Sequence, residues 1–154
     1  MGSEMCIRDR DGTFVESINQ YLTQCSQYTM GVDIADINKD SKLDIYTTDM
    51  MPYDASLILK SGGYDTEQIV EIKKDFGYLQ QYSRNSLQLQ HDDKSFDERA
   101  LMTKTYASDW SWSGLIQDFD NNGSADIFIT NGICLLYTSP SPRDLSTSRM
   151  PSSA

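Results

Sequence analysis

The sequence contains no apolar run that approaches the about 18–20 residues needed to cross a bilayer, so we predict no transmembrane segment. Histidine occurs once, at His91, within a polar stretch, and we expect its side chain to lie on the surface. The Gly-x-Ser-x-Gly pattern that positions a hydrolase nucleophile is also missing. No spacing pairs Asp33, Asp49 or Asp54 as catalytic acid and base, so we expect these to be solvated surface charges. We predict no catalytic residues, and a protein that is not an enzyme.

Basic residues are scarce, with 13 Lys and Arg against 23 Asp and Glu, and the net charge is −10. This excess of negative charge argues against a nucleic acid or an anionic membrane surface as partner. It fits a protein whose carboxylates are partly neutralised by bound cations. Cysteine is scarce too. Outside the two terminal segments described next only Cys25 remains, and we expect it to be a small buried apolar residue.

Both ends of the chain resemble translated sequencing-adapter DNA. Residues 1–10 (MGSEMCIRDR) match one reading of a transposase adapter, and residues 134–144 (CLLYTSPSPRD) match a reading of its reverse complement. Residues 148–154 resemble the adjoining flow-cell primer. We therefore predict that residues 1–10 and 134–154 are not native and take no part in the fold. The native segment is then 11–133, and we expect the natural protein to continue beyond both of its ends.

Two acidic loops share one pattern of side chains. Residues 36–44 (DINKDSKLD) and 118–126 (DFDNNGSAD) both carry oxygen-bearing side chains at loop positions 1, 3, 5 and 9, and a β-type run follows each. Hard cations such as Ca²⁺ bind about six to eight oxygens at short range. With a main-chain carbonyl at position 7, the predicted Ca²⁺ ligands are Asp36, Asn38, Asp40, Lys42 and Asp44 in the first loop and Asp118, Asp120, Asn122, Ser124 and Asp126 in the second.

Position 6 distinguishes the two loops. Gly123 suits the left-handed turn needed there, because glycine tolerates positive φ, whereas Ser41 fits less well. The second loop is therefore predicted to be the stronger site. An EF-hand is excluded, since its position 12 requires a bidentate Glu and Thr47 and Ile129 stand there. The alternative is that both loops are Asp/Asn-rich hairpin turns that bind no ion.

The first loop begins at Asp36 and the second at Asp118, and other pairs of features are separated by the same offset. Tyr28 precedes the first loop as Trp110 precedes the second, and residues 11–16 (DGTFVE) match residues 93–98 (DKSFDE). We interpret the match as an internal repeat. The period exceeds the about 40–50 residues of a usual propeller blade, so the repeat contains an insertion. Two units of a repeat protein leave open faces that neighbouring units would cover.

Hydrophobic periodicity predicts mostly strands. Met30, Val32 and Ile34 alternate toward one face of a strand, whereas apolar residues at helical spacing predict an amphipathic helix at about 66–82, reached by a loop over 52–63. Strand–loop–strand units in series predict an all-β repeat fold such as a β-propeller. The expected strands are 13–17, 28–34, 43–48, 85–90, a short one around Phe96, 110–117 and 126–130.

Four segments carry a family resemblance: residues 11–16, 28–52, 84–90 and 106–133. They resemble FG-GAP/VCBS repeats, the calcium-loop propeller repeats similar to those of integrin α-subunits. The likeness is closest to the branch that carries an ASPIC/UnbV domain, as in cartilage acidic protein. The resemblance implies about two blades of a β-propeller, Ca²⁺ as cofactor, and a secreted or cell-surface location.

On this basis we expect an extracellular binding or adhesion module with a protein or glycan ligand. Trp110 and Trp112 could stack on a sugar, although packing between blades is favoured for them. Two alternatives stay open. The segment could be a non-catalytic propeller part of a larger secreted enzyme that acts on polysaccharide, or a structural spacer.

Overall fold

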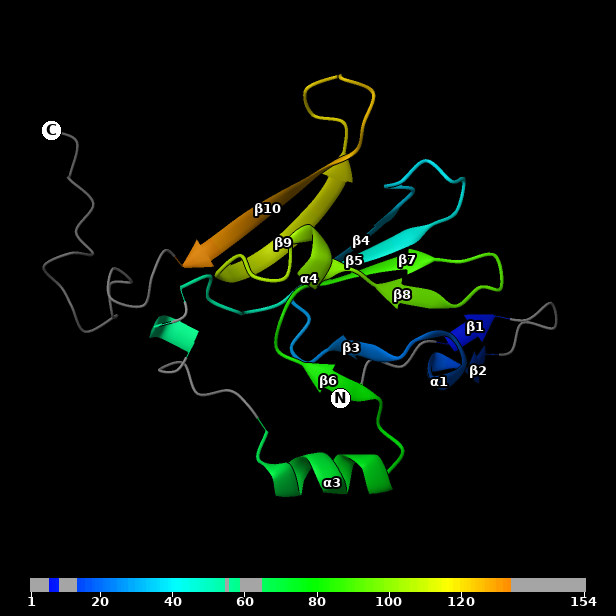
Figure 1. The fold of residues 1–154 in the computed structure, drawn as a ribbon, viewed down its shortest axis with the longest axis vertical. Helices are drawn as coiled ribbons and strands as arrows, with labels where there is room; N and C mark the ends of the chain where they lie inside the picture. Colours follow the sequence, from blue (N-terminus) through cyan, green and yellow to red (C-terminus); the bar gives the residue numbers. More distant parts are fainter. Residues whose placement is uncertain (1–5, 9–13, 55, 59–64, 134–154) are drawn as a thin grey trace, which may run out of the picture.

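The computed structural model describes residues 6–8, 14–54, 56–58 and 65–133, and β-strands dominate this part of the chain (Figure 1). The predicted all-β class is confirmed. In chain order the elements are β1 (Cys6–Arg8), β2 (Phe14–Glu16), α1 (Ile18–Tyr21), β3 (Gln24–Ser26), β4 (Gly31–Ala35), β5 (Asp44–Thr48), α3 (Glu67–Asp75), β6 (Gln80–Tyr82), β7 (Ser86–Gln90), β8 (Phe96–Glu98), α4 (Ala100–Thr103), β9 (Trp110–Gln117) and β10 (Asp126–Ile133).

The largest sheet has four antiparallel strands in the order β4-β5-β7-β8, which is also their order along the chain. The first acidic loop joins β4 to β5, and Ala35 pairs with Asp44 at its base. A tight turn joins β7 to β8, where the amide of Lys94 donates to the carbonyl of His91 at 3.1 Å. This His91 is exposed, as predicted. The sheet thus consists of two hairpins, β4–β5 and β7–β8, and the segment that contains α3 and β6 connects them.

Strands β9 and β10 form a second antiparallel hairpin, which packs on one face of the four-stranded sheet (Figure 1). Gly114 of β9 lies so close to the ring of Tyr46 that a Cβ there would stand 2.9 Å from its Cδ1 atom. The amide of Ile116 donates to Asp33 Oδ2 at 2.7 Å. The hairpin is therefore held to the sheet both by close packing and by a polar contact.

The core lies between this hairpin and the sheet. Its buried members are Tyr46, Leu87, Ala100 and Ile116, which come from β5, β7, α4 and β9. Because side chains alternate along a strand, the neighbours of Tyr46 on β5 point to the other face of the sheet. On that face Val32 is 59% exposed, so the predicted alternation of β4 is present but its apolar side lies open.

The predicted helix at 66–82 is correct only in its first part. Helix α3 ends at Asp75, and Gly77 follows with φ +78°, a conformation that glycine adopts without strain. The prediction is wrong for residues 80–82, which form β6 and pair in parallel with β3. All α3 side chains stay exposed or half-buried, and its apolar residues Ile69 and Ile72 are exposed. The predicted loop over 52–63 contains a helical turn at 56–58, while its residues 55 and 59–63 lie outside the described part of the chain.

At the N-terminal end, β1 pairs with β2, with Cys6 opposite Glu16 and Arg8 opposite Phe14. Strand β1 falls within the segment predicted to be adapter-derived, and pairing between two such short strands does not bear on the origin of the residues. Residues 134–154 lie outside the described part, so this prediction stays a prediction. No helix among the described residues has the length and apolar character needed to span a membrane.

Candidate metal-binding loops

The second acidic loop connects β9 to β10 and gathers three carboxylates. Oxygen atoms of Asp118, Asp120 and Asp126 all lie within 4.8 Å of one another, and the first and last of these residues are half-buried. At this spacing one hard cation can contact all three groups. None of the ion pairs found in the described residues involves these carboxylates. Within that part of the chain, no basic side chain pairs with them to offset their mutual repulsion.

The backbone of the second loop is folded around its first carboxylate. The amides of Asn122 and Gly123 donate to the two oxygens of Asp118 at 3.0 and 2.7 Å. This wrapping requires left-handed backbone at two positions, Asn121 with φ 57° and Gly123 with φ 84°. The predicted left-handed turn at position 6 is therefore present. Position 4 is also left-handed, which is compatible with Asn121 because Asn adopts left-handed backbone more readily than most residues.

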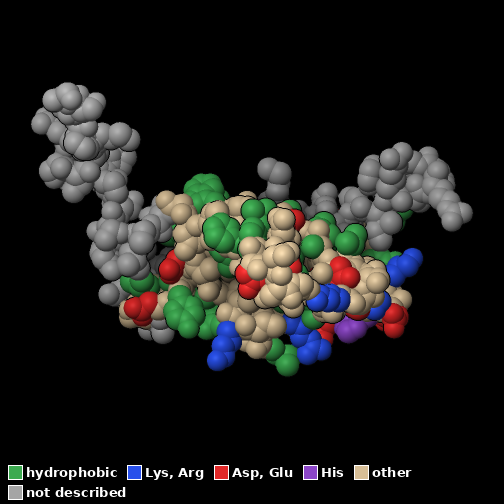
Figure 2. Space-filling model, turned by 90° about the horizontal axis from the view of Figure 1, so that it is seen from above, with side chains coloured by type: hydrophobic (Ala, Val, Ile, Leu, Met, Phe, Trp, Pro, Cys, Tyr) green, Lys and Arg blue, Asp and Glu red, His purple; other side chains and the backbone are tan. Residues whose placement is uncertain are grey.

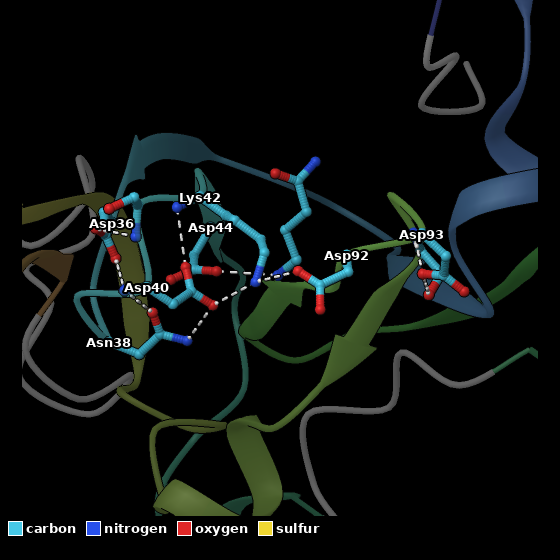
Figure 3. A network of polar contacts seen from close by, with 10 residues as sticks. Asp36, Asn38, Asp40, Lys42, Asp44, Asp92 and Asp93 are labelled. Carbon is cyan, nitrogen blue, oxygen red and sulfur yellow. Dashed lines mark hydrogen bonds and ion pairs between the residues drawn. The ribbon is translucent and has the colours of Figure 1, made fainter.

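The first loop, drawn in Figure 3, has the same amide contacts to its first carboxylate and the same two left-handed positions. The amides of Asp40 and Ser41 donate to the two oxygens of Asp36 at 3.1 and 2.8 Å, as in the second loop. Its left-handed residues are Lys39, with φ 63°, and Ser41, with φ 67°. A non-glycine residue in this region costs roughly 1–2 kcal/mol. The two loops are thus one structure with two different sequences, and the first stores more backbone strain.

Position 9 closes each loop in the same way. Asp44 Oδ2 accepts the amide of Ile37, and Asp126 Oδ2 accepts the amide of Phe119, each at 3.1 Å. Asp44 is fully buried, and its other oxygen accepts the amide of Gln90 in β7 at 3.0 Å. One carboxylate of the first loop is therefore committed to holding two strands together.

The two loops differ more at position 7 than at position 6. The ammonium of Lys42 lies 3.2 Å from Asp40 Oδ2 and 3.1 Å from Asp92 Oδ1 (Figure 3). Contact with Asp92 and then with Asp40 raises the pKa of Lys42. Desolvation works to raise the pKa of Asp40, but hydrogen bonds from Lys42 and Asn38 outweigh it and lower that pKa. The first loop thus carries its own cation, whereas uncharged Ser124 stands at this place in the second.

Hydrogen bonds link positions 3 and 5 of both loops. In the first, the side-chain amide of Asn38 donates to Asp40 Oδ2 at 3.0 Å, and in the second that of Asn122 donates to Asp120 Oδ2 at 2.9 Å. The side chains at positions 3 and 5 therefore contact each other in both loops. Among the described residues, however, only the second loop brings three carboxylates within 4.8 Å. The Ca²⁺-ligand roles predicted for the residues of both loops, including the main-chain carbonyls of Lys42 and Ser124, stay predictions.

A buried polar network at the end of β5 opposite to the first acidic loop was not predicted from the sequence. Asp49, expected to be a surface charge, is fully buried, which makes that expectation wrong. Its Oδ2 accepts the hydroxyl of Ser26 and the amide of Tyr28, and its amide donates to Asn85 Oδ1 at 2.8 Å. Asn85 in turn donates to the hydroxyl of Tyr46 at 3.1 Å. Because these hydrogen bonds pair its buried polar atoms, Asp49 has a structural role.

Two further expectations concern single residues. Cys25 is half-buried rather than buried, because it borders an open groove described below. Trp110 is half-buried and Trp112 is 49% exposed, with its indole lying over Gly132. A Cβ at Gly132 would overlap Trp112 Nε1 at 1.5 Å, so glycine there makes room for the ring.

No protein-family model, curated protein or solved structure matches this chain, so its family resemblance rests on the sequence motifs.

Proposed function

We propose that the chain is part of a calcium-binding β-propeller of the FG-GAP/VCBS type. The observation that carries the proposal is the group formed by Asp118, Asp120 and Asp126, which has the donor chemistry and spacing for one hard cation. The topology supports it as well. Propeller blades are four-stranded antiparallel sheets, and β4-β5-β7-β8 is such a sheet with its strands in chain order. The β9–β10 hairpin then corresponds to the first half of the following blade.

In this proposal the ion has a structural role. Asp118 follows β9 and Asp126 begins β10, so a shared cation would link the ends of both strands. At free Ca²⁺ about 100 times Kd, binding adds about 2.7 kcal/mol to the free energy of unfolding. Typical domains have about 5–15 kcal/mol in total, so the contribution is a substantial part of the whole.

We propose an extracellular or cell-surface location and a role as a binding or adhesion module. Extracellular calcium modules work at Kd values of about 10⁻⁴–10⁻³ M, which suits an exposed loop such as this one. The ligand would be a protein or a glycan. The half-exposed indole of Trp112 is the aromatic surface that favours a glycan, because a sugar ring can stack on it.

Thermal unfolding of the full chain, in EGTA and in excess CaCl₂, tests the calcium role. We expect Ca²⁺ to raise Tm by several degrees, following the free energy above. Asp120→Ala removes an exposed carboxylate of the second loop and should abolish most of this shift. Asn38→Ala changes the same position of the first loop and should preserve it. Equal Tm values in EGTA and CaCl₂ would contradict the proposal.

A further inference from the structure

An interface joins the two repeats. The offset that relates Asp36 to Asp118 predicts that the chain also carries a second pair of matching faces, which are not in contact with each other. In the formed interface the β9–β10 hairpin packs on the four-stranded sheet through Gly114 and Ile116. Gly114 lies against Tyr46 and Thr48, with a Cβ there 2.9 Å and 3.1 Å from the nearest atoms of each. Ile127 and Ile129 of β10 pack against the same core.

Shifting these positions back by the same offset leads to the opposite face of the sheet. The residues of the packed side of the hairpin, Gly114, Ile116, Ile127 and Ile129, correspond to Val32, Ile34, Ile45 and Thr47. We name the latter four the open sheet face. Val32 and Ile34 are 59% and 52% exposed, although their counterparts Gly114 and Ile116 are buried. The first repeat thus exposes the open sheet face, whereas the second repeat buries the corresponding side of its β9–β10 hairpin.

The open sheet face is a groove rather than a flat surface. A cavity of about 350 Å³ lies over Val32, Ile34 and Ile45, and Ile18 and Leu22 border it. Its polar members are uncharged, namely Thr29, Thr47, Ser86 and Gln88. A chain with net charge −10 therefore keeps this groove free of charge.

The complementary side of the interface is also uncovered. Tyr46, which receives Gly114, corresponds to Phe128, and Ile37, which packs on the core beside Tyr46, corresponds to Phe119. Phe119 and Phe128 contact each other, with ring centroids 5.5 Å apart. Together with Leu115, which pairs with Phe128 across the hairpin, they form what we name the outer hairpin face.

The outer hairpin face is apolar and exposed over about half of each side chain, with 47% for Leu115, 51% for Phe119 and 53% for Phe128. Exposed apolar side chains are visible among acidic ones on the surface of the molecule (Figure 2). Asp126 also points to this side of the hairpin, by strand parity with Phe128. Its counterpart Asp44 is fully buried and accepts the amides of Ile37 and Gln90, so an acid at this position can be buried when its oxygens are paired.

We propose that two copies of this two-repeat chain associate head to tail, with the outer hairpin face of one copy seated on the open sheet face of the next. This contact takes the place of the neighbouring repeats that would cover the same two faces in a longer protein. The contact repeats, between chains, the packing seen within one chain. It is not an identical copy, because Val32 replaces Gly114 and Leu115 replaces Asp33. The larger side chain of Val32 requires a wider spacing between the two packed faces. Leu115 cannot accept the hydrogen bond that Asp33 accepts, but it adds apolar area to the contact. Such a contact is heterologous, so each dimer keeps one open face of each kind and can grow further.

Sedimentation velocity of the full chain over a wide concentration range tests this proposal. We expect the mean mass to rise with concentration through dimers to larger species. Val32→Lys places a charge in the groove, and Phe128→Lys places one on the outer hairpin face. Both positions are more than half exposed, which favours folding of the variants. Each variant alone should associate at least about tenfold more weakly, because an unpaired charge is costly to bury.

An equimolar mixture of the two variants separates this contact from other kinds of association. Val32→Lys keeps an intact outer hairpin face and Phe128→Lys keeps an intact open sheet face, so the mixture should form one-to-one dimers and no larger species. Ile72→Lys on α3, a position 54% exposed, is the matched control and should associate like the original chain. Ile34→Lys repeats the groove test at a second position, should Val32→Lys fail to fold.

Three results would overturn the proposal. These are an original chain that stays monomeric at every concentration, a lysine variant that associates as strongly as the original chain, and a mixture that stays monomeric although both variants fold.

Discussion

The main-chain amide of Ile116 in β9 donates a hydrogen bond of 2.7 Å to Oδ2 of Asp33 in β4. This bond joins the two repeats, since each residue belongs to a strand of its own hairpin. Ile116 is buried, so its amide has little access to water if the carboxylate is removed. A buried donor without a partner costs about 1–3 kcal/mol.

Asp33→Ala should therefore lower the free energy of unfolding by about 1–3 kcal/mol, measured by urea denaturation. Asp33→Asn retains an acceptor oxygen for the Ile116 amide and should cost less. If the two variants unfold at the same urea concentration as the original chain, the bond does not hold the hairpin to the sheet.

Tyr46 provides a prediction on alkaline pH. Burial raises the pKa of its hydroxyl to about 12 from an ordinary value of 10.0, and the bond from Asn85 offsets only part of this. The unfolded chain ionises this group first, so its contribution is complete below pH 10 and is lost as pH rises through 12. Tyr46→Phe should flatten the fall in stability over this window, as followed by urea melts at several pH values. An unchanged pH profile would show that Tyr46 has no part in it.

Exchanging the residues at loop position 7 should change the Ca²⁺ affinities of the two loops in opposite directions. Lys42→Ser removes the ammonium next to Asp40 and should strengthen Ca²⁺ binding by the first loop several-fold, because a competing cation is gone. Ser124→Lys should weaken binding by the second loop. Titration with Tb³⁺, read by its luminescence, would measure both. Equal affinities in all three proteins would mean that position 7 is neutral.

Position 6 predicts a matched pair of stability changes. Ser41→Gly relieves left-handed backbone at φ 67° and should raise the free energy of unfolding by about 0.5–1 kcal/mol in EGTA. Gly123→Ala introduces the same strain at φ 84° and should lower it by a similar or larger amount. Nothing lies within 4 Å of a Cβ at Gly123, so crowding does not contribute. Urea melts that show no change, or changes of the same sign, would contradict the strain argument.

The parts of the fold that depend on local pattern could be predicted from the sequence. Strand β9 has the predicted bounds because its alternation is long and ends at the acidic loop. The short strand β6 was missed, since it forms only by pairing with β3, which lies far earlier in the chain. A helical pattern continued into that segment, and the tertiary pairing overrode it.

The candidate site shows the same division. Its ligand residues and the left-handed position 6 follow from the spacing within one loop. The ion pair between Lys42 and Asp92 does not, because Asp92 comes from the turn between β7 and β8, much further along the chain. The burial of Asp49 likewise depends on Asn85, which no local pattern connects to it. The local sequence therefore predicts where the charged residues of the loops lie, but their distant partners depend on the tertiary fold.

Equilibrium dialysis of the full chain against radioactive calcium measures directly whether the loop of residues 118–126 binds Ca²⁺. We predict saturable binding of about one ion per chain, in the Kd range of about 10⁻⁴–10⁻³ M. Asp120→Ala should lose this binding, and Asn38→Ala should retain it. No saturable binding by the folded chain, or equal binding by the Asp120→Ala variant, would contradict a Ca²⁺ site in this loop.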